Sequence, residues 1–400
     1  MEYVFSDKIA NLKPSAVREI LKSTADPSVI SFAAGNPAPE AFPVDAVKKI
    51  SNEILEKDPI LALQYGVTEG YTPLLLDLEK LLQNRFHIDL EGNSVMVTSG
   101  ATQVMELVTK VLCNEGDVIA CENPSFIGSL NCFRSYGVRL EGVPVEADGM
   151  DLQALEDLLK KEPNIKFLYT IPNFQNPTGV TMSAEKRKGL YELACKYNFI
   201  ILEDNPYGDL RAYGEDVPAI KTLDTEGRVI YAGTFSKVIS PGLRVGYVCG
   251  PAPIVSKMVV GKQTEDVHTA MWNQLIVYGW LEQYDYEEHA QRMHGIYRRK
   301  LDLMCNLVDS ELGSAVEYVK PEGGMFVWCK LKDSLDMMTF CKKAVEKKVA
   351  VVPGTAFLPK ETDTTNCFRM NFSTPSDEAI QKGMKLLGEV VREMEAEGKE

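Results

Sequence analysis

The sequence predicts an α/β protein with a large domain, built on a seven-stranded, mostly parallel sheet covered by helices, and a small α+β domain formed by both termini. Short apolar runs alternate with helical segments from Ser94 to about Val267, which is typical of a parallel sheet. Beyond Val267 long helical stretches take over. In addition, 400 residues exceed one comfortable core, which favours two domains.

We expect three segments along the chain. Residues 1–50 would join the small domain and supply a loop able to lie over a binding site. Residues 51–285 would form the large domain, and residues 286–400 the C-terminal small domain.

The first segment and its junction predict two helices and two glycine-rich loops. A short helix is expected from Lys13 to Ser23, and an apolar strand from Val29 runs into the loop Gly35-Asn36-Pro37. Taken alone, that loop is more simply a plain turn. A second loop covers residues 63–70, and Thr72 has the form of an N-cap before a helix from Pro73 to Phe86.

The large sheet is predicted from apolar, β-branched runs at Val95–Thr98, Val118–Cys121, Arg139–Val145, Ile165–Ile171, Phe199–Leu202, Val229–Ala232 and Val245–Cys249. The first run enters an amphipathic helix after Gly100, so the free N–H groups of Ala101 and Thr102 form a natural phosphate cradle. The P-loop pattern is missing, and Ser-Gly-Ala before a helix is usually just a turn.

The smaller domain is predicted from long helices followed by short strands. The helices are Asn273–Tyr286, Glu287–Asp309 and the terminal Ser376–Glu397, and the strand-like runs are Gly323–Cys329, Val349–Val352 and Cys367–Phe372.

Composition excludes several classes of protein. A net charge of −14 disfavours nucleic acids and anionic membrane surfaces as main partners. We find no signal peptide and no apolar run near the ~20 residues of a membrane span, so a cytoplasmic location is expected. The nine cysteines have no Cys-x-x-C pair, and the four histidines have no ligand spacing beyond a weak His289…His294 pair, so we expect reduced thiols and no metal.

One lysine stands out. Lys237 follows the buried run Arg228–Gly233 and therefore lies just past a strand end, where α/β sheets bind ligands. A partly desolvated lysine can attack a carbonyl to give a Schiff base, while Arg244, Ser236 and Thr234 could hold a phosphate. An aldehyde and a phosphate together indicate pyridoxal phosphate (PLP), although a lone Ser-Lys is an ordinary surface dipeptide.

Further groups suited to PLP follow neighbouring strand ends. Asp204 could keep the ring nitrogen protonated, and Asn176 and Tyr207 could bond the phenolic oxygen. Phe126 could lie flat on the ring. Each has a simpler interpretation: a turn for Asn176-Pro177-Thr178-Gly179, a helix cap or loop anion for Asp204, and core packing for Phe126.

In their order, Asn176-Pro177-Thr178-Gly179, Asp204-x-x-Tyr207, and Ser236-Lys237 followed by Pro241-Gly242-Leu243-Arg244 resemble the class I/II aminotransferases of the aspartate aminotransferase fold, type I among PLP enzymes. The resemblance runs from about Ile30 to Phe372. Gly35-Asn36-Pro37 and Gln64-Tyr65-Gly66 resemble the kynurenine/2-aminoadipate aminotransferase branch.

The resemblance implies roles for individual residues. Lys237 would form the Schiff base and move the substrate α-proton, Asp204 would hold the pyridinium, and Arg369 would grip the substrate α-carboxylate beside Asn176 and the Gly35-Asn36 loop. The phosphate would be held by Arg244, Ser236, Thr234 and the amides of Ala101 and Thr102. A homodimer is implied, with Tyr65 reaching the partner's phosphate. Phe126 departs from the tyrosine that many members have, which removes a hydroxyl.

The resemblance further implies a ping-pong aminotransferase that uses an L-amino acid and a 2-oxo acid such as 2-oxoglutarate. Aromatic, branched-chain and 2-aminoadipate-like donors all stay open, because small shape differences decide among them. Two other activities also fit the fold: a PLP-dependent C–S lyase or other elimination enzyme, and a non-catalytic ligand-sensing module.

Overall fold

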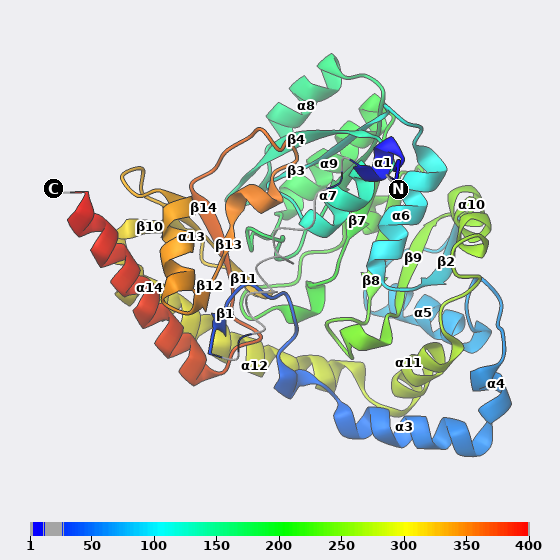
Figure 1. Cartoon of the computed structure of the whole chain (residues 1–400). Helices are drawn as coiled ribbons and strands as arrows, with labels where there is room; N and C mark the ends of the chain where they lie inside the picture. The colour runs from blue at the N-terminus through cyan, green and yellow to red at the C-terminus, as the bar shows by residue number, and fades with distance from the viewer. Residues whose placement is uncertain (1–2, 11, 13–25, 27, 399–400) are drawn as a thin grey trace.

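The computed structural model describes residues 3–10, 12, 26 and 28–398, and its centre is a mixed eight-stranded sheet (Figure 1). In spatial order the strands are β2 (Asn93–Thr98), β9 (Gly246–Pro251), β8 (Val229–Thr234), β7 (Ile200–Asp204), β6 (Ile165–Thr170), β3 (Val118–Asn123), β4 (Arg139–Glu146) and β5 (Gly149–Met150).

The sheet confirms the predicted parallel core and corrects its number of strands. The eighth strand, β5, is a two-residue partner of β4 in a tight hairpin, too short to give a sequence pattern. The four pairings among β4, β3, β6, β7 and β8 are parallel, whereas β9 runs antiparallel to both β8 and β2. The carboxyl ends of β6, β7 and β8 therefore lie side by side, as the prediction required.

Two layers of helices cover the sheet, and the alternation along each strand decides what each layer meets. On one face, which we call the α8/α9 face, Ile201 of β7 packs with residues of α8 (Leu152–Lys161), α9 (Ala184–Tyr197) and η3 (Ile220–Leu223). On the other face, which we call the cavity face, Leu202 packs with residues of α6 (Ala101–Leu112) and α7 (Ile127–Arg134).

The remaining elements of the large unit complete its perimeter. They are α3 (Val44–Lys57), α4 (Pro59–Leu63), α5 (Thr72–Asn84), η2 (Gly208–Leu210), η4 (Pro241–Leu243), α10 (Ala252–Gln263) and α11 (Met271–Gln283). The predicted N-cap at Thr72 is wrong, because Tyr71 takes that place and Thr72 is the first helical residue. Tyr71 is fixed there by a tertiary contact, its main-chain N–H donating to Gln274 Oε1 at 2.7 Å.

A second, smaller unit contains two further sheets. The four-stranded sheet has the order β10 (Val316–Tyr318), β11 (Phe326–Leu331), β14 (Cys367–Asn371) and β13 (Val352–Pro353). The two-stranded sheet pairs β1 (Ile30–Ser31) with β12 (Val349–Ala350). The single strand predicted at Val349–Val352 is thus two strands, since the chain passes from one sheet to the other at Val351.

Helices pack on these two sheets, and long α14 runs along the outer edge of the unit (Figure 1). The helical segments of this unit are α12 (Tyr286–Leu307), η5 (Val308–Leu312), η6 (Gly313–Ala315), α13 (Met337–Glu346), η7 (Gly354–Phe357) and α14 (Asp377–Glu397). The terminal helix begins as predicted, because Ser376 Oγ accepts a hydrogen bond from Ala379 N–H at 3.2 Å and caps it.

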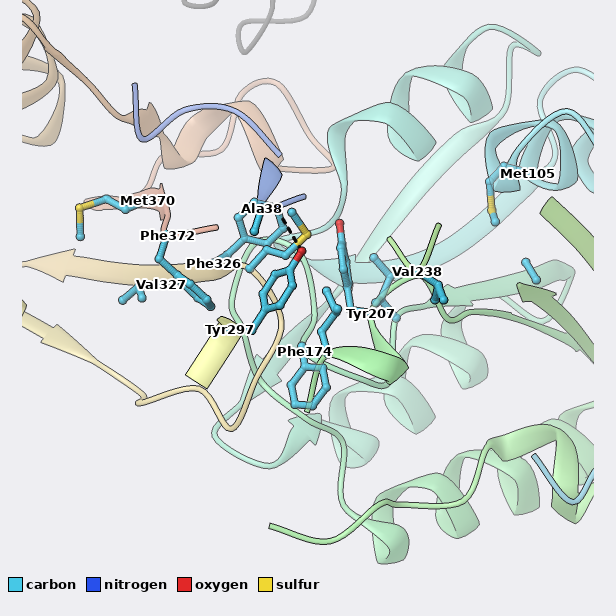
Figure 2. Close-up of a cluster of buried hydrophobic side chains, with 14 of the residues drawn as sticks. Ala38, Met105, Phe174, Tyr207, Val238, Tyr297, Phe326, Val327, Met370 and Phe372 are labelled. Atoms are coloured by element: carbon cyan, nitrogen blue, oxygen red, sulfur yellow. Dashed lines mark hydrogen bonds between the residues drawn. The ribbon is translucent and has the colours of Figure 1, made fainter. Parts of the chain in front are cut away.

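The N-terminal segment contributes α1 (Asp7–Ala10), β1 and η1 (Pro39–Ala41). Ala38 N–H donates to Tyr297 OH at 3.1 Å, which attaches this segment to α12. Figure 2 shows that contact beside Phe326 of β11 and Tyr207, so one apolar core joins the two sheets. The helix predicted from Lys13 to Ser23 lies outside the described residues. None of the helices in the described ranges is long and apolar enough to cross a membrane.

Candidate active site

A cavity of about 150 Å³ opens at the carboxyl edge of the large sheet. It is lined by Ala101, Thr102, Met105, Phe126, Ser129, Ile171, Asp204, Pro206, Tyr207, Thr234, Ser236, Lys237, Pro241 and Arg244. Nine residues predicted to bind a cofactor are therefore brought to one place by strand ends that lie far apart in the sequence.

Lys237 follows β8 and reaches across the cavity. Its Nζ donates to Gly35 O at 2.9 Å, and no described carboxylate pairs with it. Burial, with help from the positive charges of Arg244 and Arg369, lowers the pKa of Lys237 to about 8. About a tenth of this amine is therefore neutral and nucleophilic at pH 7, far more than of an ordinary lysine.

Asp204 ends β7 on the cavity face, and only one of its two carboxylate oxygens is hydrogen bonded. Tyr169 OH donates to its Oδ2 at 2.8 Å, whereas its buried Oδ1 has no partner in the described part of the chain. Burial raises the pKa of Asp204 to about 7, against the hydrogen bond from Tyr169. An unpaired buried oxygen facing a cavity calls for a ligand that carries a proton donor.

Tyr169 and Ser129 support Asp204 from behind, and neither residue was predicted from the sequence. Ser129 Oγ donates to Tyr169 OH at 2.9 Å. The strand alternation contained a signal, because Tyr169 is paired with Leu202, which lies two residues before Asp204 on the same face of β7.

The groups predicted to bind phosphate surround the start of α6. Gly100, with φ +85°, caps that helix, and a Cβ there would lie 2.2 Å from Arg244 Nη2. Arg244 Nη2 donates only to a carbonyl, Ser99 O at 3.2 Å, and no described carboxylate forms an ion pair with it. Opposite, Thr234 Oγ1 donates to Ser236 Oγ at 2.9 Å. Two hydroxyls, a helix N-terminus and a free cation together suit a phosphate.

A second cation, Arg369, lies on β14 and is fully enclosed. Its Nη1 donates to Asn176 Oδ1 at 2.8 Å and its Nη2 to Ala33 O at 2.8 Å, while its buried Nε lacks a partner among the described residues. Burial lowers the pKa of Arg369 to about 10. Asn176 Nδ2 in turn donates to Tyr207 OH at 3.1 Å, which links Arg369 to the cavity.

Aromatic rings hold Arg369 in place, and their roles were not predicted. Its guanidinium lies 4.1 Å from the ring centre of Phe326 and 4.8 Å from that of Phe357. Phe326 also meets Tyr207 edge-on, with 5.8 Å between ring centres (Figure 2).

Five predicted site residues do not line this cavity, namely Asn176 and Arg369, described above, and Gly35, Asn36 and Tyr65. Tyr65 is 81% exposed, and its ring meets that of His268 at 5.8 Å between centres. Asn36 is exposed, and its carbonyl accepts hydrogen bonds from Ser373 Oγ at 2.7 Å and Thr374 Oγ1 at 2.9 Å. Tyr65 and Asn36 are therefore accessible to a group outside this cavity, such as a second chain.

The cavity fits PLP by its own chemistry. It offers an amine for the aldehyde (Lys237), a bare carboxylate oxygen for the ring nitrogen (Asp204), and a helix N-terminus with a free guanidinium (Arg244) for the phosphate. Fold and cavity thus define the class as an α/β enzyme built around a reactive lysine and an anion site.

The chain belongs to the class I and II aminotransferases, whose family model matches residues 27–387. It is 41% identical over 396 residues to aromatic-amino-acid aminotransferase 1 of Thermococcus litoralis, covering 98% of this chain and 95% of that protein. It is 36% identical over 391 residues to the 2-aminoadipate transaminase of Thermus thermophilus, covering 97% and 96%.

A solved structure supports the same family assignment. The kynurenine aminotransferase of Pyrococcus horikoshii, in complex with PMP, kynurenine and its product, has a TM-score of 0.94 and 39% identity, with 97% of each chain covered. Members of this family depend on PLP, so the protein is a PLP-dependent amino-acid aminotransferase of fold type I.

Proposed function

We propose that the protein moves the amino group of L-amino acids with aromatic, branched-chain or 2-aminoadipate-like side chains to a 2-oxo acid such as 2-oxoglutarate, in a ping-pong reaction. The observation that carries this proposal is one cavity in which a lysine of lowered pKa faces a buried carboxylate with a bare oxygen. The relatives named above support these donor classes.

Each part of the cofactor has a matching group. Asp204 Oδ1 would accept the proton of the ring nitrogen, Asn176 and Tyr207 would bond the phenolic oxygen, and Phe126 would stack on the ring. Arg244, Ser236, Thr234 and the amides of Ala101 and Thr102 would hold the phosphate. When bound, PLP supplies an aldehyde for the amine and a protonated ring that accepts the electron pair left at the substrate Cα.

Lys237 would do two tasks. Its neutral Nζ would hold the aldehyde in the resting enzyme, and after displacement by substrate it would take the proton from Cα and return it to the cofactor side. The lowered pKa supports both tasks, because an amine with a pKa of about 8 gains and loses a proton readily near neutral pH.

Arg369 would bind the substrate α-carboxylate. Its Nη1 already points at Asn176, and its unpartnered Nε leaves capacity for another oxygen. The loop at Gly35 and Asn36 would close the substrate side, since Gly35 O reaches Lys237. A carboxylate held there would place Cα toward Lys237 and exclude water.

We also propose a homodimer in which Tyr65 reaches the partner's phosphate. Apolar side chains around Tyr65 are exposed in the single chain, with Ile60 at 74%, Leu63 at 73% and Val67 at 57%. Such a patch on α4 and the following loop suits a second copy of the chain.

We further propose the domain boundaries and the location of the protein. The chain would divide into 1–50, 51–285 and 286–400, and the pairing of β1 with β12 supports a small domain built from both termini. A cytoplasmic location would agree with nine cysteines that are all free thiols.

The test is the absorption of the purified protein after single amino acids are added without acceptor. We expect donors of the proposed classes to convert the yellow PLP form to the pyridoxamine form, and 2-oxoglutarate to restore it. Release of ammonia and pyruvate from a thioether amino acid would instead indicate a lyase. A bound cofactor that no donor converts would indicate a sensor.

A further inference from the structure

A buried lysine outside the cavity, Lys262, anchors a polar network behind the phosphate groups. Lys262 lies in the last turn of α10, is fully buried, and donates from Nζ to Gln103 Oε1 at 2.6 Å and to Asp266 Oδ1 at 2.8 Å. Gln103 belongs to the first turn of α6, which packs against α10 (Figure 1). The network therefore joins two helices at the cavity.

This network forms hydrogen bonds with the turn that precedes Ala101 and Thr102. Ser99 N–H donates to Gln103 Oε1 at 2.8 Å, and Ser99 Oγ donates to Asp266 Oδ2 at 2.6 Å. Gln103 Nε2 also donates to Asp266 Oδ2, at 3.0 Å. Both the main chain and the side chain of Ser99 are thus fixed by the two groups that Lys262 holds.

The same segment holds the other side of the phosphate site. Asn273 Nδ2 donates to Leu243 O at 2.8 Å, next to Arg244. Residues 262–273 therefore contact both the helix N-terminus and the loop that carries the free guanidinium. A shift of this segment would move the two halves of the site relative to each other.

Charge balance gives Lys262 a second effect. Asp266 alone would place a negative charge beside a bound phosphate, and Lys262 neutralises it at contact distance. Although burial opposes ionisation, hydrogen bonds from Lys262, Ser99 and Gln103 lower the pKa of Asp266, so the carboxylate stays charged and needs its partner.

We propose that Lys262 is a positioning residue for the cofactor phosphate, acting through Asp266 and Gln103 on the Ser99 turn. The proposal rests on the proposed function, because it assumes that Ala101, Thr102 and Arg244 bind the phosphate. It predicts that losing Lys262 weakens binding of a phosphorylated ligand and spares a ligand that lacks the phosphate.

The experiment titrates the apoprotein with PLP and with pyridoxal, followed by protein fluorescence, in wild type and the variants Lys262→Met and Ser99→Ala. We expect Lys262→Met to raise the dissociation constant of PLP about ten-fold and that of pyridoxal less than about two-fold. Ser99→Ala removes only hydrogen bonds, leaves no buried charge, and should raise the PLP constant about three-fold.

The control is Lys300→Met, which removes an equally buried lysine that donates to Pro375 O at 2.6 Å, away from the cavity. It should leave both constants unchanged. An unchanged preference for PLP in both variants, or an equal loss for both ligands, would overturn the proposal. If Lys262→Met does not fold, the dissociation constants of Ser99→Ala for PLP and pyridoxal test the proposal by themselves. Wild type without any preference for PLP would instead overturn the phosphate site itself.

Discussion

Two neighbouring carboxylates on β7, Glu203 and Asp204, are both buried but lie on opposite faces of the sheet. On the α8/α9 face, the two oxygens of Glu203 accept the main-chain N–H groups of Ile220 and Lys221, each at 2.8 Å. On the cavity face, Asp204 has one donor and one bare oxygen. Burial alone therefore does not distinguish these two carboxylates, whereas the bare oxygen of Asp204 and the cavity that Asp204 lines do.

Lysines and arginines repeat the contrast. Lys221 Nζ has three acceptors, Asn93, Asp224 and Val229 O, but Lys237 has one. Arg187 uses all its nitrogens on five acceptors, whereas Arg369 leaves Nε unpaired. Asp204 Oδ1 and Arg369 Nε thus lack a partner among the described residues, and a ligand would supply the missing partner.

The largest expected effect compares Asp204→Asn with Glu203→Gln. Asp204→Asn should reduce amino transfer by about 10²–10³, because an amide cannot hold the ring nitrogen protonated, while the apoprotein melts no lower than wild type. Glu203→Gln should keep its turnover per folded molecule but lose ~2–4 kcal/mol of stability, because its new N–H₂ faces a main-chain donor. The turnover rate of each variant measures the effect on activity, and urea unfolding measures the effect on stability.

A reversed result would contradict these assigned roles of Glu203 and Asp204. Loss of turnover in Glu203→Gln with stability intact would mean that complete pairing does not mark a structural role. Normal turnover in Asp204→Asn would remove Asp204 from the site.

Next in size is the pair Arg369→Lys and Arg187→Lys. Arg369→Lys should lower kcat/KM for the amino donor about 100-fold, since an ammonium cannot bind a carboxylate in two-point fashion. Arg187→Lys should leave kcat/KM unchanged and cost ~2–3 kcal/mol of stability by orphaning buried carbonyls. Steady-state kinetics with one donor, beside denaturant titration, would show whether the two arginines differ as their partners do.

A smaller effect distinguishes Lys237 from Lys221 by the pH dependence of stability. The pKa of Lys237 falls from its ordinary 10.5 to about 8, so the unfolded chain binds more protons between these values and this lysine destabilises the apoprotein below pH 8. Lys237→Met should therefore stabilise the apoprotein by ~2 kcal/mol at pH 7, with the gain vanishing toward pH 10.5. Lys221→Met should instead destabilise it, because Asp224 loses a buried partner. Urea unfolding of both apoproteins at two pH values measures this.

Local patterns were enough to predict the strand ends and hence most of the cavity. β-branched runs fix where β6, β7 and β8 stop, which places Asn176, Asp204 and Lys237 together once the strands are parallel. The antiparallel β9 and the hairpin partner β5 were not predictable, because long-range pairing and not local propensity decides them.

Contacts between distant segments were equally beyond sequence reasoning. Arg369 and Asn176 are 193 positions apart, and only packing of the small sheet against the large one brings them within 2.8 Å. The resemblance suggested a role for Arg369, but neither the ring stack of Phe326 nor the support of Asp204 by Tyr169 follows from a motif.

The N-terminal segment contacts the two cations of the site through its backbone. Ala33 O accepts from Arg369, and Gly35 O accepts from Lys237. Every amino acid carries a carbonyl, so these contacts do not depend on which side chains the segment presents. Because Phe32, Ala33 and Ala34 are buried, their side chains have to be kept, whereas variation of the exposed side chain of Asn36 can search for new donor preferences without disturbing these contacts.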